Sequence, residues 1–233
     1  MKRMSLLLLL TLPAVPVASA QKVASSAGLS FKSAYAPDST TVRLLTGADE
    51  PELNELMARV LRVEKLRLQF ADARLAGRTL HLTYQEFRQG RPGPEQELAK
   101  PAVTQFDAQG GFAFTAYTRQ LSERQVETRF LLPRALVPRT FEAVAGRADE
   151  YSLRSDIRRQ YRAADQADRP PASPASELHL PIGPKVPLLV YTLPYESEGW
   201  LLYCNLAQSK MPVTEWYQRF KVPHFVVFYM RVE

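Results

Sequence analysis

The stretch Leu66-Arg67-Leu68-Gln69-Phe70 decides the fold class, because apolar and polar residues alternate along it without interruption. A period of two is typical of a β-strand that has one face on a core and the other in water. The same alternation returns in Leu80-His81-Leu82-Thr83-Tyr84 and between Val126 and Leu132. Because the turn signal Ala76-Gly77-Arg78 separates the first two segments, we expect them to form a hairpin or meander.

Two other segments have helical spacing. Between Leu53 and Leu61, apolar residues recur at i, i+3, i+4, i+7 and i+8, after Asp49 as a plausible N-cap and Pro51 in the first turn. We expect this helix to pack on the core. Residues 149–164 carry apolar side chains at a spacing of four, which predicts a second helix, and a short third helix is expected to begin near Pro212.

These patterns predict an α+β protein with mostly antiparallel strands, sandwich-like or a partly open barrel, and two or three packed helices. Helices do not alternate with every strand, which disfavours a parallel sheet. We interpret residues 46–233 as a single β-rich domain with a proline-rich connector at 165–187. The stretch 188–233 is too short to bury a core of its own without disulfides or metals, so its strands are expected to join the sheets of the first half.

The first residues read as a targeting segment. Lys2 and Arg3 precede an apolar stretch that begins at Leu6, and Ala18-Ser19-Ala20 has the small-residue pattern that signal peptidase cleaves. We therefore predict a signal peptide over residues 1–20 and a flexible or extended leader over 21–45. The mature chain is expected to be exported, either periplasmic or secreted, and to have no membrane span, because its other apolar runs are far shorter than the ~20 residues of a spanning helix.

Composition excludes several classes of protein. With 45% hydrophobic and 23% charged residues among 233, the chain is not disordered throughout. One cysteine rules out a disulfide scaffold, and the three histidines, His81, His179 and His224, lack the spacing of a metal site. Glycine-rich phosphate loops do not occur. We therefore predict no metal, no cofactor and no nucleic-acid partner.

The segment Tyr195-Glu196-Ser197-Glu198-Gly199-Trp200 is the main candidate for ligand binding. Tyr195 and Trp200 offer aromatic surfaces beside the carboxylates of Glu196 and Glu198, a combination that is common in binding sites. Two carboxylates at i, i+2 spacing also suit acid/base hydrolysis of a glycan if they share one face of a strand. The alternative is an ordinary polar hairpin turn.

A row of arginines is the second candidate. Arg154, Arg158 and Arg162 follow one another at a spacing of four in the second predicted helix, where they can contact anions. The alternative is a solvated face with local ion pairs to nearby acidic residues. Removing Lys2 and Arg3 from the 30 basic residues leaves 28 against 24 acidic ones, so the net charge of the mature chain is +4.

The sequence favours a non-catalytic function. We interpret the chain as an exported binding or scaffolding component of the cell envelope, whose partner is an envelope protein or glycan. The alternative is an exported hydrolase that acts on an envelope polymer or glycan, with Glu196 or Glu198 as the acid/base. No residue pattern determines the ligand or the oligomeric state.

Overall fold

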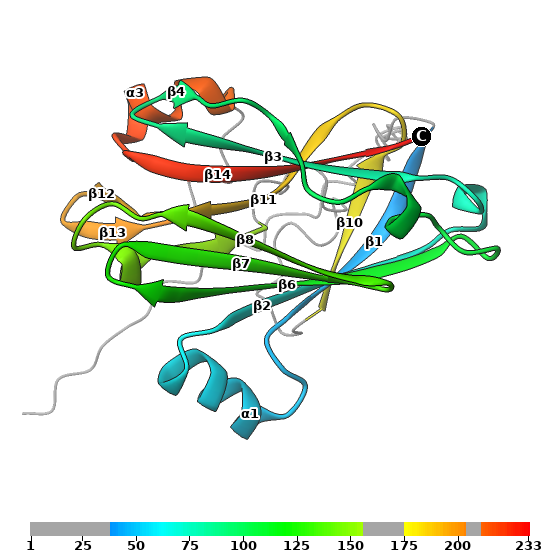
Figure 1. Cartoon of the computed structure of the whole chain (residues 1–233), viewed down its shortest axis with the longest axis horizontal. Helices are drawn as coiled ribbons and strands as arrows, with labels where there is room; N and C mark the ends of the chain where they lie inside the picture. The colour runs from blue at the N-terminus through cyan, green and yellow to red at the C-terminus, as the bar shows by residue number, and fades with distance from the viewer. Residues whose placement is uncertain (1–37, 156–174, 204–210) are drawn as a thin grey trace, which may run out of the picture. The chain divides into compact units, whose positions relative to one another are not determined.

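The computed structural model describes residues 38–155, 175–203 and 211–233. Figure 1 shows two antiparallel β-sheets stacked face to face, with a small third sheet at one end. Sheet I has the strand order β10-β1-β2-β6-β7-β8, and sheet II has the order β4-β3-β14-β11-β9, with β5 also paired to β3. The third sheet is the hairpin β12–β13. The prediction of a mostly antiparallel, sandwich-like fold is therefore confirmed.

The strands of sheet I span Ser39–Thr46 (β1), Glu64–Ala71 (β2), Gly111–Ser122 (β6), Gln125–Leu132 (β7), Ala135–Glu142 (β8) and Ala175–Pro181 (β10). Those of sheet II span Leu80–Arg88 (β3), Arg91–Pro92 (β4), Gln96–Glu97 (β5), Ser152–Arg154 (β9), Val186–Thr192 (β11) and His224–Val232 (β14). The hairpin strands are Tyr195–Ser197 (β12) and Trp200–Leu202 (β13).

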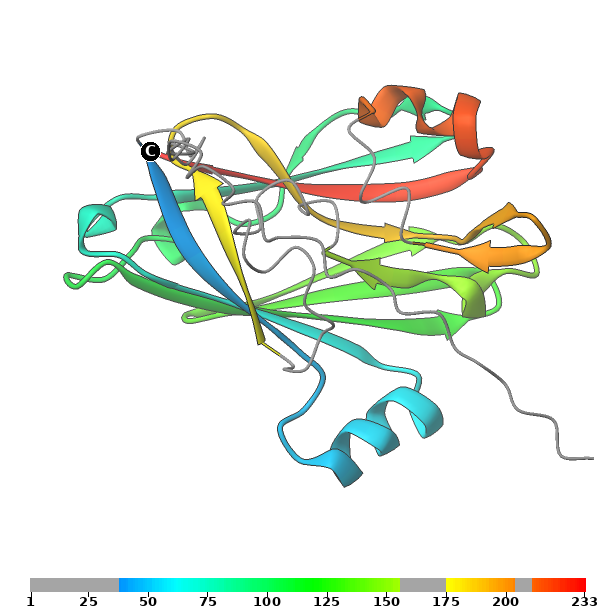
Figure 2. The same ribbon diagram turned by 180° about the vertical axis from the view of Figure 1, so that it is seen from behind.

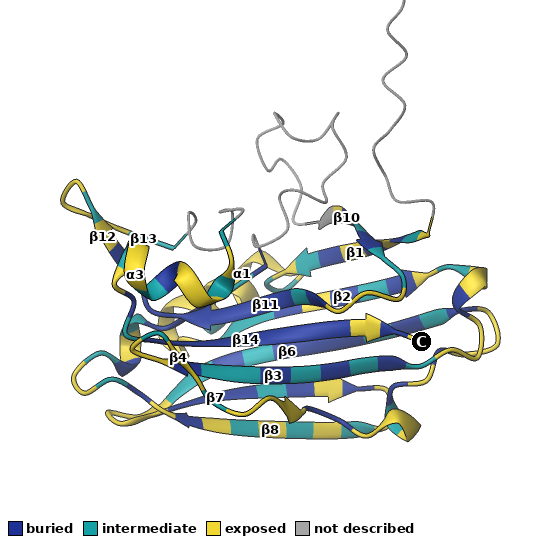
Figure 3. Ribbon diagram, turned by 90° about the horizontal axis from the view of Figure 1, so that it is seen from above, coloured by how far each residue is buried: buried dark blue, intermediate teal, exposed yellow. Residues whose placement is uncertain are grey.

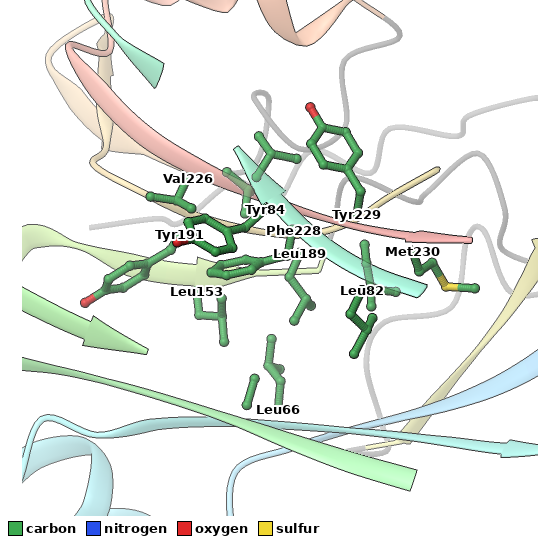
Figure 4. Close-up of a cluster of buried hydrophobic side chains, with 14 of the residues drawn as sticks. Leu66, Leu82, Tyr84, Leu153, Leu189, Tyr191, Val226, Phe228, Tyr229 and Met230 are labelled. Atoms are coloured by element: carbon green, nitrogen blue, oxygen red, sulfur yellow. The ribbon is translucent and has the colours of Figure 1, made fainter. Parts of the chain in front are cut away.

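The core lies between the two sheets, where apolar side chains of both meet (Figure 4). Figure 3 marks the buried positions along the ribbon of each strand. Phe130 of sheet I contacts Phe228 of sheet II with ring centroids 4.9 Å apart. Strand β14 is buried at every position except Arg231, because β3 and β11 flank it on both edges. Each large apolar side chain that is fully buried stabilises the fold by about 1.5–3 kcal/mol. The C-terminal strand thus joins the first half of the chain in one core, as predicted.

The expected hairpin between the first two alternating segments does not form. Strand β2 belongs to sheet I, whereas β3 pairs with β14 in sheet II. A 3₁₀ turn over Ala73–Leu75 carries the chain from one sheet to the other, and Leu75 is completely buried in this crossing. A period of two shows which face of a strand is apolar but does not determine its partner, so the prediction of a hairpin was wrong.

The first helix forms but does not pack on the core. It consists of α1, Pro51–Glu55, and a π-helical continuation over Leu56–Val60, and no residue in either part is buried. Figures 1 and 2 show that it projects from the outer side of sheet I, away from sheet II. Glu50, rather than the expected Asp49, is the N-cap residue, and its side chain makes no capping hydrogen bond. The predicted packing of this helix was therefore wrong.

The second predicted helix is contradicted where the structure describes it. Residues Ala148–Glu150 form a 3₁₀ turn, and the chain then enters β9, where Leu153 pairs with Tyr191 of β11. Tyr151, Ser152 and Leu153 are consecutive and all buried, an arrangement that a one-sided helix does not allow. The rest of this predicted helix, residues 156–164, lies outside the described residues.

The C-terminal third follows the expected order of elements. Strands β10 and β11 begin within the predicted connector 165–187, and the third helix, α3, spans Trp216–Phe220 after a 3₁₀ turn over Val213–Glu215. Unlike α1, this helix is anchored, because the Trp216 side chain is 1% exposed. In the described part of the chain, two short α-helices accompany the sheets, and no helix is long and apolar enough to cross a membrane.

Asp72 fixes the crossing between the sheets and should make stability depend on pH. Hydrogen bonds from the Arg74 side chain hold the pKa of Asp72 at about 2, below its ordinary 3.8. Because the ionised form is favoured in the folded state, its contribution is present above pH 4 and is lost as the pH falls toward 2. We expect Asp72→Asn to cost about 1 kcal/mol at pH 7, the usual value of a capping interaction.

Urea denaturation of the parent and Asp72→Asn at pH 7, 4, 3 and 2 tests this assignment. The difference between the two unfolding free energies should narrow between pH 4 and pH 2. A difference that stays constant over this range would show that Asp72 does not contribute through its charge.

Candidate binding surface

The hairpin β12–β13 carries the four residues predicted for ligand binding, but it separates them. Tyr195 is 5% exposed and packs on Phe220 of α3, with ring centroids 4.9 Å apart. Trp200 projects at the other end of the hairpin and is 72% exposed. Tyr195 therefore anchors the hairpin, whereas Trp200 is available for contact with a partner.

The two glutamates do not continue one strand. Glu196 pairs with Leu201, and the strand ends at Ser197. Glu198 and Gly199 form the turn, both with positive φ, 52° and 79°. This combination is that of a two-residue hairpin loop, and it removes Glu198 from the alternation that would place it on the face of Glu196.

Arg154 is the one arginine of the predicted row that lies in the described residues. Its guanidinium carbon lies 4.5 Å from the centroid of the Tyr203 ring, and the residue is half-buried at the end of β9. Arg158 and Arg162 lie outside the described residues. Arg154 therefore takes part in a local cation–π contact.

At the same end of the sandwich, partly buried polar groups join the two sheets. Glu64 of β2 accepts hydrogen bonds from Ser152 Oγ and the backbone N–H of Leu153, each at 2.5 Å, and from Thr118 Oγ1 at 3.3 Å. The recess beside these groups encloses only about 20 Å³, which is the space of a single water molecule. The hydrogen bonds of Glu64 therefore have a structural role, since they tie β9 to sheet I.

His224 forms a second buried network. The ring lies between Tyr151 and Glu86: Nδ1 is 2.5 Å from the Tyr151 hydroxyl oxygen, and Nε2 is 2.9 Å from Glu86 Oε1. The hydrogen bond from His224 lowers the pKa of Glu86, and burial raises the pKa of Tyr151 to about 12. Glu86 accepts from Nε2–H, and the Tyr151 hydroxyl completes the network through its hydrogen bond with Nδ1.

Partly or fully exposed cations gather on the outer side of sheet I, the side that faces away from sheet II. Strand register places Lys65 of β2, Tyr117 of β6 and Arg129 of β7 in one row across three strands. Arg67 lies two residues along β2, and Arg119 lies two residues along β6. These side chains point outward because their neighbours Leu66, Ala116 and Phe130 are buried in the core. We call Lys65, Arg67, Tyr117, Arg119 and Arg129 the basic face.

The carboxylate of Glu127, which lies beside Arg119 and Arg129, is already paired with both. Glu127 is 7% exposed, and its Oε2 accepts from Arg119 Nε at 2.9 Å and from Arg129 Nε at 2.7 Å. These hydrogen bonds hold the pKa of Glu127 below its ordinary value against the opposing effect of burial. Glu127 therefore orients the two guanidinium groups, which remain 42% and 41% exposed, and leaves the group with a positive charge.

A groove extends the basic face along sheet I. Gln69, the next outward residue of β2, accepts from Arg67 Nη2 at 3.2 Å and also lines this groove of about 480 Å³. Small side chains such as Ala71 and Ala113 leave the space open, and the lining includes one cation, Arg134, and one carboxylate, Asp107. A volume of this size is within the range of small-ligand sites.

The sequence analysis did not predict this surface, although the basic residues that form it stand at polar positions of alternating segments. Basic residues occupy the polar positions of three alternating strands, but the sequence does not show that β2, β6 and β7 are neighbours. The comparisons with known proteins do not add an assignment: no protein-family model, curated protein or solved structure matches this chain. The residues themselves must therefore support any functional conclusion.

Proposed function

We propose that this chain is an exported, non-catalytic binding protein of the cell envelope, and that its basic face holds an anionic polymer. The observation that supports this proposal is the row Lys65–Tyr117–Arg129, with Arg67 and Arg119 beside it. Neighbouring strands lie about 4.8 Å apart, so the outer two cations of the row stand ~10 Å apart with an aromatic ring between them. This spacing suits a chain of repeated anionic groups joined by less polar units.

The arrangement favours binding to an extended ligand over binding to a single ion. The cations lie on a sheet face instead of converging in a pocket, and the adjacent groove continues this surface toward Arg134. Screening in water weakens each exposed charge, so affinity must come from several contacts at once. An exported protein with this surface would act by retaining or organising an acidic envelope polymer.

Dextran sulfate, with uncharged dextran as the neutral probe, tests the proposal. We expect the triple variant Lys65→Gln, Arg67→Gln, Arg129→Gln to bind labelled dextran sulfate at least about tenfold more weakly, measured by fluorescence anisotropy at 0.15 M salt. Three lost contacts of about 0.5–1 kcal/mol each give this magnitude.

The matched control removes three exposed cations elsewhere, with Arg91→Gln, Lys100→Gln and Arg219→Gln. This variant carries the same net charge as the first. Its affinity for dextran sulfate should fall by less than about threefold. Equal losses in the two variants would show that binding follows total charge alone, and binding of uncharged dextran would refute the electrostatic proposal.

A further inference from the structure

Two arginines cover the carboxylate of Glu127 almost completely. Strands β6 and β7, which carry these residues, are neighbours in sheet I (Figure 1). Arg119 stands directly opposite Glu127, and Arg129 follows Glu127 by two residues on the same side of β7. Both arginines place Nε on the same oxygen, Glu127 Oε2, at 2.9 and 2.7 Å. The two guanidinium groups are therefore held side by side.

The other nitrogens of both guanidinium groups are free to bind a ligand. A guanidinium has five N–H donors in one plane, so the single bond to Glu127 leaves the four Nη hydrogens of each arginine. Among the described residues, none accepts a hydrogen bond from the Nη atoms of Arg119 or Arg129. The two side chains also remain 42% and 41% exposed.

Tyr117 lies next to both arginines. It stands directly opposite Arg129 and precedes Arg119 by two residues on the same side of β6. Its side chain is half-buried on the outer side of the sheet. An aromatic ring beside the cations suits an anion that is attached to a larger, less polar unit. This position therefore favours an esterified anion over a free ion.

We propose that Arg119 and Arg129, oriented by Glu127, hold one sulfate or phosphate monoester of the bound polymer, with Tyr117 against the unit that carries it. This inference rests on the proposed function and refines it by naming the anionic group. We call Arg119, Arg129 and Tyr117 the ester subsite. Glu127 is a positioning residue, because it acts through the two arginines.

The number and arrangement of oxygens distinguish a monoester from a carboxylate. A sulfate or phosphate monoester has three free oxygens in a tetrahedral arrangement, so it can accept from two guanidinium groups at once. A carboxylate has two oxygens in one plane, which match the fork of a single guanidinium. Two neighbouring guanidinium groups that are held by one internal carboxylate therefore select the monoester.

Glu127 has two opposite effects on an incoming anion. Immobilising a long side chain on binding lowers affinity, and Glu127 removes this cost because it already holds both Nε atoms. Its negative charge, in contrast, repels the anion. Charge alone thus predicts that loss of Glu127 strengthens the binding of every polyanion, whereas positioning predicts that it weakens the preference for monoesters.

Dextran sulfate, dextran phosphate and carboxymethyl dextran, matched in charge per sugar, test the inference on the full chain. In fluorescence anisotropy at 0.15 M salt, we expect at least one ester polymer to bind at least about tenfold more tightly than carboxymethyl dextran. The tighter ester identifies the group that the subsite prefers. A smaller margin for both esters would overturn this inference but leave the proposed function intact, whereas binding of none of the three polymers would overturn both.

The variant Arg119→Lys with Arg129→Lys keeps both charges but removes both planar guanidinium groups. Its preference for the ester polymer should fall below about threefold, while its affinity for carboxymethyl dextran stays within about twofold of the parent. The matched control, Arg67→Lys with Arg134→Lys, makes the same exchange outside the subsite and should keep the preference. A preference that survives in the first variant would refute the subsite.

Glu127→Ala tests the positioning role, and Glu142→Ala is its matched control. Glu142 is exposed on the outer side of β8, so the two variants make the same charge change on the same side of sheet I. Both should bind carboxymethyl dextran more tightly than the parent, but only Glu127→Ala should lower the ester preference below about threefold. An unchanged preference would mean that Glu127 does not position the arginines for binding. Circular dichroism of each variant establishes that it is folded before titration.

Discussion

Gly110→Ala is expected to destabilise the protein by about 3 kcal/mol or more, which corresponds to a fall in melting temperature of ~6–12 °C. Gly110 has a φ of 74°, and a Cβ placed there would lie 1.9 Å from the backbone oxygen of Asp72. The two residues approach closely because the backbone N–H of Asp72 donates to the Gly110 carbonyl. Alanine would therefore force apart the turn that precedes β6 and the crossing that follows β2.

Gly77→Ala provides a matched control for this substitution. Gly77 has nearly the same φ, 73°, but a Cβ there meets no atom within 4 Å. Gly77→Ala should therefore lower the free energy of unfolding by only ~1–2 kcal/mol, the cost of placing a side chain in the left-handed region. Urea denaturation of both variants separates the cost of the backbone conformation from that of the steric overlap. Equal decreases in the free energy of unfolding would show that the contact with Asp72 does not matter.

Replacing His224 by phenylalanine should lower the free energy of unfolding by about 2–4 kcal/mol. The His224 side chain is 1% exposed, so the variant keeps an aromatic ring in the core but removes the hydrogen bonds to the Tyr151 hydroxyl and to Glu86. Leaving a buried polar group without its partner costs about 1–3 kcal/mol. Glu86 keeps its ion pair with Arg88, at 2.6 Å, which limits the loss on that side.

A double-mutant cycle with Tyr151→Phe tests whether the network acts as a unit. Tyr151→Phe alone removes the hydroxyl that is hydrogen-bonded to His224 Nδ1 and accepts from the backbone N–H of Val144. The free energy of unfolding of the double variant should fall by less than the sum of the decreases in the two single variants, because removing both partners leaves fewer unsatisfied groups. Strictly additive unfolding free energies would contradict a direct hydrogen bond between the two side chains.

The alternating segments made the β-rich class predictable from local pattern. Leu66, Leu68 and Phe70 do face the core, and the C-terminal strand does join the first half of the chain. The segment around Tyr151 misled the prediction, because Leu153 fits a spacing of four as well as it fits a short strand. Its partner, Tyr191, is distant in sequence, and only that pairing selects the strand.

The candidate binding surface was harder to foresee than the fold. Tyr195, Glu196, Glu198 and Trp200 looked like one site because they are adjacent in sequence, but the tight turn at Glu198 and Gly199 distributes them over a hairpin. The basic face assembles instead from three strands, and strand register places its central tyrosine beside cations that are distant in the chain. A surface formed by strand register is invisible to any pattern within one segment.

The sequence by itself determined the apolar side of each strand and the apolar stripe of the first helix, since these depend on residue order alone. The tertiary structure alone decided which other segment packs against each apolar side. Strands β2 and β3 pack in different sheets, although they follow each other in sequence, and the helix at residues 51–60 buries nothing. The physical reason is that periodicity fixes direction relative to the backbone, whereas burial depends on which distant segments pair and fill the space opposite.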